Sequence, residues 1–85
     1  MSEYAEAVRR ARRSVANNNA LATVHALEPH LDEVMERGDL RPTLDLAWAL
    51  GELGRCAERE ALLSSVRRPT PEARMTLSLA RAGWF

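Results

Sequence analysis

The stretch from Leu44 to Leu53 predicts a helix that has almost no polar side. At about 100° per residue, its apolar side chains spread around most of the helix circumference. Only Asp45 and Glu52, which are seven residues apart and share a face, mark a narrow polar strip. A helix that is apolar nearly all round is a buried helix. Because a chain of 85 residues can rarely surround a helix completely, either its own helices or a partner must cover this one.

The composition predicts a single helical domain spanning residues 1–85. Apolar residues make up 46% of the chain, with only four Gly and four Pro, which is not the composition of a disordered tail. Twelve basic and twelve acidic residues cancel, which argues against a dedicated nucleic-acid binder and favours self-association or a protein partner. One cysteine, no stretch of transmembrane length and no signal-peptide pattern predict a bacterial-type cytoplasmic protein.

Apolar periodicity and turn residues predict about five helices. The first covers 3–16, with Ser2 as its N-cap, and the run Asn17-Asn18-Asn19 forms the turn after it. A second apolar period begins at Leu21 and crosses Pro29, which either kinks this helix or splits it into two.

The remaining helices are also bounded by turn residues. Gly38 ends the second segment, and Asp39 caps the helix that runs to about Leu53. Gly54 stops that helix, and a further helix covers 55–67. Thr70-Pro71-Glu72 opens the last one. Helices joined by turns of a few residues predict an all-α array of antiparallel helical hairpins.

Small residues predict how two of these helices meet. Ala57, Ala61 and Ser64 form a row along one side of the helix after Gly54, and Ala47 and Gly51 form a matching row on the helix before it. Small side chains allow two helix backbones to approach closely. The pair is therefore predicted to be a tight antiparallel hairpin with these rows as its seam.

No residue pattern of a catalytic, metal or cofactor site is found in the sequence. His25 and His30 are five residues apart, do not share a helical face and have no supporting ligand cluster. Cys56 is interpreted as a small buried hydrophobic residue. Without a Gly-rich phosphate loop, HExxH or GxSxG, we expect neither metal nor cofactor, and a protein that is not an enzyme.

Three sets of side chains each allow two interpretations. A basic cluster on the first helix forms either a phosphate-contacting face or, as we expect, its solvated side: Arg9, Arg10, Arg12 and Arg13. Arg59 lies in an apolar stripe, so it either extends its charge to water or pairs with Asp45, Glu52 or a partner. Trp84 and Phe85 either plug the core or anchor a partner.

The segment from Leu46 to Arg55, with the Leu-Gly-Arg turn at its end, resembles a tetratricopeptide repeat (TPR). The matching positions are Ala47, Leu50, Gly54, Leu63 and Pro71, whereas Cys56 and Arg59 depart from the repeat. The stretch 39–46, together with Leu53-Gly54 and Glu58, is similar to the TPR-type subunit of type III secretion needle-protein chaperones. That resemblance implies a concave helical surface that holds the amphipathic helix of a needle protein in the cytoplasm.

These observations predict a protein–protein interaction module or small chaperone that binds an amphipathic helix of a partner. The candidate partner-contacting residues are Leu31, Met35, Leu44, Trp48, Arg59, Trp84 and Phe85. The alternative is a homodimeric all-helical regulator that contacts nucleic acid through the Arg-rich first helix. Both functions use an apolar surface that docks on a partner or on a second copy. An enzyme would instead need an acid–base or nucleophile constellation, which the sequence lacks.

Overall fold

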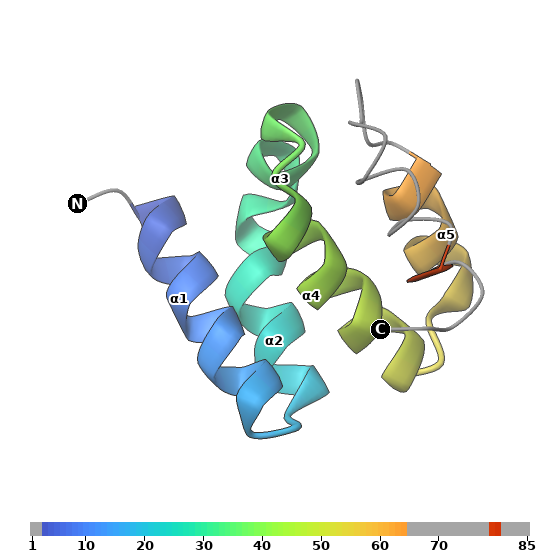
Figure 1. The fold of residues 1–85 in the computed structure, drawn as a ribbon, viewed down its shortest axis with the longest axis horizontal. Coiled ribbons are helices and arrows are strands. Elements are labelled where there is room, and N and C mark those ends of the chain that lie inside the picture. The colour runs from blue at the N-terminus through green and yellow to red at the C-terminus, as the bar shows by residue number, and fades with distance from the viewer. Residues whose placement is uncertain (1–2, 65–78, 81–85) are drawn as a thin grey trace.

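The structure, a computed structural model, is built of helices joined by short turns, which confirms the all-α class (Figure 1). It describes residues 3–64, 79 and 80, and within these no strand is present. Five α-helices and one 3₁₀ turn follow one another along 3–64. They are α1 (Glu3–Ala16), α2 (Ala20–Leu27), the 3₁₀ turn (Glu28–His30), α3 (Leu31–Arg37), α4 (Leu40–Glu52) and α5 (Cys56–Ser64). The predicted N-cap Ser2 lies outside the described residues.

Three turns form where the sequence predicts them. Asn18 adopts the left-handed conformation with φ 55°, and the side chain of Asn19 accepts a hydrogen bond from the amide of Ala22 at 3.1 Å. Gly38 and Gly54 take φ values of 65° and 76°, where a residue with a Cβ is strained. These local backbone requirements coincide with the helix boundaries.

Pro29 splits the second helical segment. It lies in the 3₁₀ turn, and α3 restarts at Leu31 without an intervening loop. Proline has no amide hydrogen, and its ring conflicts with the carbonyl four residues earlier, which disfavours a regular α-helix through this position. Of the two alternatives that the sequence left open, the break with an immediate restart is the one observed.

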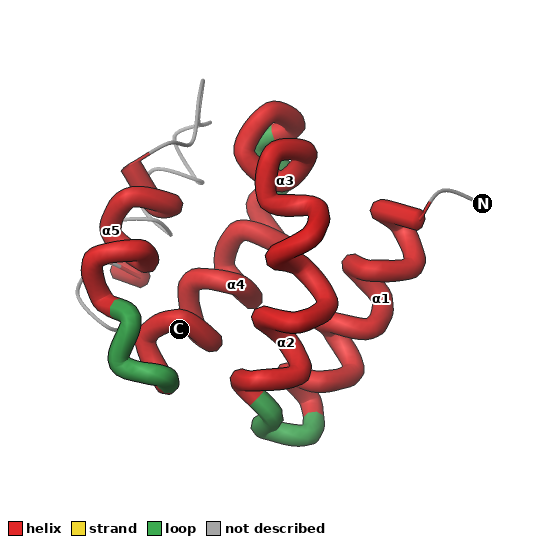
Figure 2. The backbone as a smooth tube through the Cα atoms, turned by 180° about the vertical axis from the view of Figure 1, so that it is seen from behind, coloured by secondary structure: helices red, strands yellow, loops and turns green. Residues whose placement is uncertain are grey.

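Helix α4 lies at the centre and contacts each of α1, α2, α3 and α5 (Figures 1 and 2). The predicted burial of its apolar residues is confirmed for Leu44, Leu46, Ala47, Ala49 and Leu50, all at most 9% exposed. The chain's own helices therefore supply much of the cover that the sequence analysis assigned to either helices or a partner.

The core around α4 receives large side chains from every other helix. Each fully buried aliphatic side chain contributes about 1.5–3 kcal/mol relative to an exposed one. The buried contributors outside α4 include Tyr4, Ala11, Val24, Leu27, Val34, Leu62, Leu63 and Ala80. That the hairpins stack in the manner of TPR repeats stays a prediction.

Asp45 is buried, although the sequence places it with Glu52 on the narrow polar strip of α4. Its side chain is 2% exposed, whereas Glu52 is exposed as expected. Arg12 of α1 donates a hydrogen bond to Oδ1 at 2.9 Å, and Nη1 of Arg41 lies 3.7 Å from the same oxygen. Burial raises the pKa of Asp45, and the two arginines oppose that rise. At Asp45, α4 thus presents a buried carboxylate to the arginine of α1.

The α4–α5 hairpin forms, but its predicted seam of small residues is wrong. Ala57, Ala61 and Ser64 are exposed, while Leu62 and Leu63 are buried in the core around α4. Burying two leucines removes far more apolar surface from water than burying two alanines does. This difference turns the leucine side of α5 toward α4.

The first turn of α1 is tied to the junction between α3 and α4. Tyr4 donates a hydrogen bond to Oδ2 of Asp39 at 2.9 Å, and the guanidinium of Arg37 stacks 4.6 Å from the centre of its ring. The ring of His30 approaches Tyr4 edge-on at 6.3 Å. The predicted side-chain cap by Asp39 is wrong: it occupies the N-cap position of α4 but makes no side-chain capping bond, and its carboxylate accepts from Tyr4.

Candidate partner-binding groove

An apolar groove of about 440 Å³ lies between the α2–α3 junction, α4 and α5. Its volume falls within the range of about 300–1,000 Å³ that is typical of ligand sites in proteins. The described residues that line it, hereafter the groove, are Glu28, Leu31, Met35, Leu46, Leu50, Arg55, Glu58, Ala61 and Leu62.

The groove combines a buried floor with an exposed lip. Leu46 and Leu50, one helical turn apart on α4, are 2% and 4% exposed, and Leu62 of α5 is 4% exposed. Leu31 is 36% exposed, and Met35 is partly buried against the core. The floor is therefore fixed by the core, while α3 presents apolar side chains that water still reaches.

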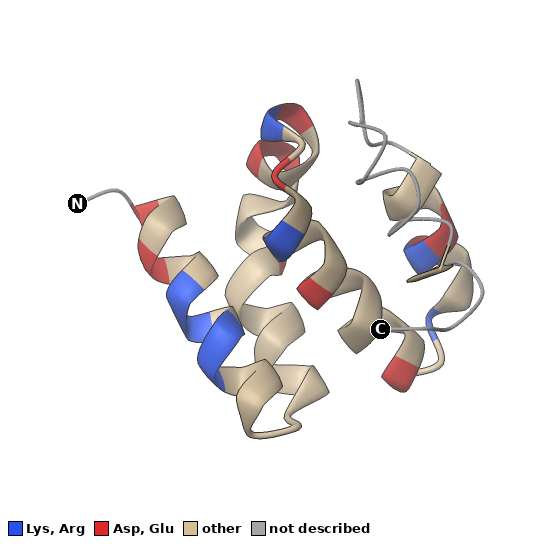
Figure 3. Cartoon of the chain, in the orientation of Figure 1, with Lys and Arg blue, Asp and Glu red and all other residues tan. Residues whose placement is uncertain are grey.

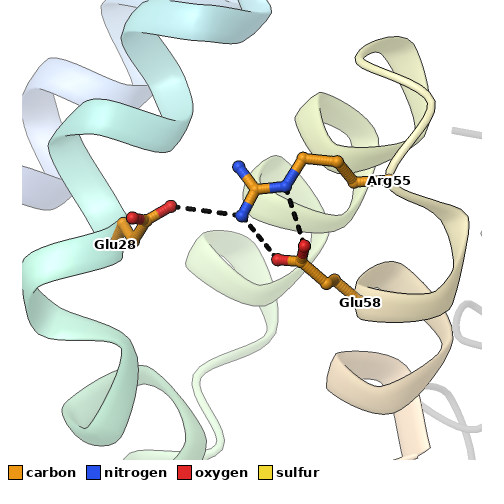
Figure 4. A network of polar contacts seen from close by, with 3 residues as sticks. All are labelled: Glu28, Arg55 and Glu58. Atoms are coloured by element: carbon orange, nitrogen blue, oxygen red, sulfur yellow. Dashed lines mark hydrogen bonds and ion pairs between the residues drawn. The ribbon is translucent and has the colours of Figure 1, made fainter.

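Three charged residues that line the groove form one polar network (Figure 4). Nε of Arg55 donates to Oε1 of Glu58 at 2.9 Å, and Nη2 donates to the other oxygen of the same carboxylate. Nη2 also lies 3.4 Å from Oε2 of Glu28, which belongs to the other wall. The hydrogen bonds from Arg55 lower the pKa of Glu58. This group carries one cation and two anions, so its net charge is −1.

Only some of the predicted partner-contacting residues line the groove. Leu31 and Met35 line the groove. Leu44 is only 9% exposed and belongs to the core, and Trp48 packs against that core without lining the groove. The periodicity of α4 marks Leu44 and Trp48 as apolar, but it does not show which of its faces other helices cover. The predicted contacts Trp84 and Phe85 lie outside the described residues.

Arg59 packs along α4 and does not pair with Asp45. A Cβ built on Gly51 would lie 3.0 Å from Nη1 of Arg59 and 3.4 Å from its Cδ. Within the described part of the chain, the buried Nε of Arg59 has no hydrogen-bond partner. Of the two carboxylates proposed for it, Asp45 is engaged by Arg12 and Arg41, and Glu52 forms no ion pair with it in the described part of the chain. Gly51 thus provides the space in which the arginine lies, and Arg59 does not line the groove.

Sequence reasoning missed two parts of the groove. The sequence predicts burial for Leu46 and Leu50 but not their role as a groove floor, although their spacing of four residues places them on one face. The charged group formed by Glu28, Arg55 and Glu58 was also missed. Arg55 and Glu58 are three residues apart, which signals a helical pair, but no local signal brings Glu28 to them.

The side chains considered for metal or thiol chemistry do not assemble into a site. Cys56 is exposed, so its interpretation as a buried hydrophobic residue is wrong. It is the first residue of α5, whose buried side chains, Leu62 and Leu63, lie nearer the other end of the helix. Among residues 3–64, 79 and 80, no three His, Cys, Asp or Glu side chains are placed to hold a metal ion. In the same residues, no helix is both long and apolar enough to cross a bilayer.

Comparison of the chain with protein-family models, with curated proteins and with solved structures found no match.

Proposed function

We propose that the protein is a small interaction module or chaperone whose groove receives the apolar face of an amphipathic helix from a partner protein. The observation that carries this proposal is the groove itself, with a buried leucine floor and an exposed lip at Leu31. A helix that lays its apolar stripe into such a groove buries side chains spaced at i, i+3 or i+4, and i+7.

The charged residues of the groove indicate what charge the partner helix carries. Protein interfaces combine an apolar centre with a polar rim, and here Glu28, Arg55 and Glu58 supply the rim. Because this group carries a net charge of −1, a basic residue beside the apolar stripe of the partner complements it. The proposed occupant is therefore an amphipathic helix with a Lys or Arg at the edge of its apolar face.

The resemblance of residues 39–58 to needle-chaperone subunits supplies a candidate for that partner. The amphipathic helix of a type III secretion needle protein has the required apolar stripe. Holding such a helix would keep it from assembling prematurely. This candidate rests on the sequence resemblance, whereas the choice of a helix as the occupant rests on the groove.

The test uses a synthetic amphipathic peptide of about five helical turns with Leu at i, i+3, i+4 and i+7 positions and Lys beside the stripe. Leu31→Glu places a charge on the lip and should lower peptide affinity at least about tenfold. Leu21→Glu is the matched control, because Leu21 is 54% exposed on α2 and does not line the groove. It should leave affinity within about twofold.

Isothermal titration calorimetry gives the affinities, and circular dichroism confirms that both variants stay folded. A peptide of the same composition without the stripe should bind at least about tenfold more weakly. Equal binding of both peptides, or equal loss in both variants, would overturn the proposal. Light scattering that shows a dimer dissolved by Leu31→Glu would identify a second copy as the occupant and would also contradict it.

A further inference from the structure

A second hollow, of about 430 Å³, lies between α1 and α2 and has a different chemistry from the groove. It is shallow and open, and its lining is rich in hydrogen-bond donors. The described residues that line it, hereafter the α1–α2 hollow, are Arg10, Arg13, Ser14, Asn17, Ala22, His25 and Ala26.

The basic cluster of α1 is divided between two sides of the helix. Figure 3 shows these arginines along the second half of α1. Arg12 reaches α4 and binds the buried Asp45, so it is part of the internal packing. Arg10 and Arg13 lie on the opposite flank, which faces α2, at the i and i+3 positions of one stripe. Ser14 and Asn17 continue that stripe at i+4 and i+7.

Helix α2 supplies the floor of the α1–α2 hollow and a further donor. Ala22 and Ala26 are four residues apart and partly buried, so their small side chains leave room between the helices. His25 lies between them in the sequence, is exposed and borders the same hollow. Donors from two helices thus converge on one concave surface.

The charge of the α1–α2 hollow is not cancelled locally. No acidic side chain is among its described lining residues. The carboxylate of Glu6 lies 3.9 Å from Arg10, at the limit of an ion pair, and Arg13 has no ion pair with any described residue. In the groove, by contrast, Arg55 is bracketed by two carboxylates.

We propose that the α1–α2 hollow binds a phosphate group. Guanidinium groups match the geometry of phosphate oxygens through paired hydrogen bonds, and two of them with an imidazole and an amide nearby supply the donors. The phosphate belongs either to a free phosphorylated compound or to a nucleic-acid backbone. This inference does not depend on the proposed helix partner, since the two surfaces share no lining residue.

The test records amide and side-chain NMR shifts of the full chain at low salt during three titrations. The probes are inorganic phosphate, adenosine monophosphate and a single-stranded oligonucleotide of twelve bases. We expect saturable shifts at Arg13 and His25. Arg13→Gln should lower affinity about tenfold, the loss expected for one charge-assisted hydrogen bond. Arg9→Gln removes the same charge from the same helix outside the hollow and should change affinity less than about twofold.

The three probes separate the sources of the phosphate. Saturation by phosphate or the monophosphate identifies a site for one free phosphate group. Saturation by the oligonucleotide alone, with affinity that falls steeply as salt rises, identifies a nucleic-acid backbone. Absence of saturable shifts with every probe would overturn the proposal, as would an equal loss of affinity in the Arg9 and Arg13 variants.

Discussion

The contact between Arg12 and Asp45 makes a prediction about how α1 is held on α4. Arg12→Met removes the guanidinium but retains much of the apolar stem, so it tests the charge rather than the packing. Asp45 is 2% exposed and the Arg12 side chain is 47% exposed. Removing the arginine leaves a buried carboxylate with only Arg41, 3.7 Å away, to oppose its charge.

The loss in free energy of unfolding caused by Arg12→Met should lie between the values for exposed and for fully buried ion pairs. An exposed pair contributes about 0–1 kcal/mol, whereas removing one partner of a fully buried pair costs about 3–5 kcal/mol. Because water reaches Arg12, and because Asp45 can take up a proton when its partner is lost, we expect about 1–2 kcal/mol for Arg12→Met. For a domain of this size, each 1 kcal/mol corresponds to a fall in Tm of about 4–8 °C.

A double-mutant cycle measured by urea unfolding isolates the interaction. Asp45→Asn should cost less than about 1 kcal/mol, because burial favours the neutral form at this position. In the Asp45→Asn background, Arg12→Met should cost less than about 0.5 kcal/mol. Arg13→Met is the control, and it should change stability by less than about 0.5 kcal/mol in either background. If Arg12→Met costs the same with and without the Asp45→Asn change, the arginine does not act through this carboxylate.

The same pair predicts a dependence of stability on pH. Since the pKa of Asp45 is raised, the folded chain holds this proton more tightly than the unfolded chain does. Stability from this group is therefore present at low pH and lost as pH rises through the folded pKa. Relative to Asp45→Asn, the unaltered chain should gain stability as pH falls from 7 toward the ordinary carboxyl range near about 4. A constant difference between the two would refute the burial argument.

Two further predictions concern a tyrosine and a glycine. Burial, followed by the hydrogen bond to Asp39, raises the pKa of Tyr4 to about 12, and this is the chain's one tyrosine. Its phenolate absorbance should therefore appear at about pH 12, and at lower pH in Asp39→Asn. The stability that Tyr4 contributes should be lost between about pH 10 and 12. A titration midpoint at about pH 10 in the unaltered chain would contradict this. Gly54→Ala should cost about 1–2 kcal/mol through backbone strain alone, since φ is 76° and no atom lies within 4 Å of the added methyl. Gly51→Ala is the comparison variant in thermal unfolding. There the higher helix propensity of alanine offsets the shift that the new methyl forces on Arg59. An equal loss of stability in both variants would refute the strain argument.

The sequence predicts those parts of the fold that local chemistry determines. Asn18, Gly38 and Gly54 mark turns because each position needs a backbone conformation that few residues tolerate. Pro29 marks the break between α2 and α3 because proline removes a helical hydrogen bond and clashes with the preceding turn. The burial of α4 follows from an apolar circumference.

Packing between distant helices determines the parts that the sequence did not predict. The burial of Asp45 is offset by Arg12, which lies 33 residues away and reaches it from α1. Likewise, the composition of α5 does not show whether Ala61 or Leu63 faces α4, since both belong to regular stripes. Leu31 and Met35, which the sequence predicts as partner-contacting residues, do line the groove. Its charged group depends instead on the contact between Glu28 and Arg55, which are 27 residues apart.

The break at Pro29 has a consequence for how one wall of the groove is held. It leaves α3 as a helix of seven residues, shorter than a helix that is stable alone, with Val34 as its one fully buried side chain. Both ends of this short helix are held by one side chain of α1, because Arg37 at its end and His30 before its start contact the ring of Tyr4. The α3 wall of the groove therefore depends on Tyr4, although Tyr4 does not line the groove.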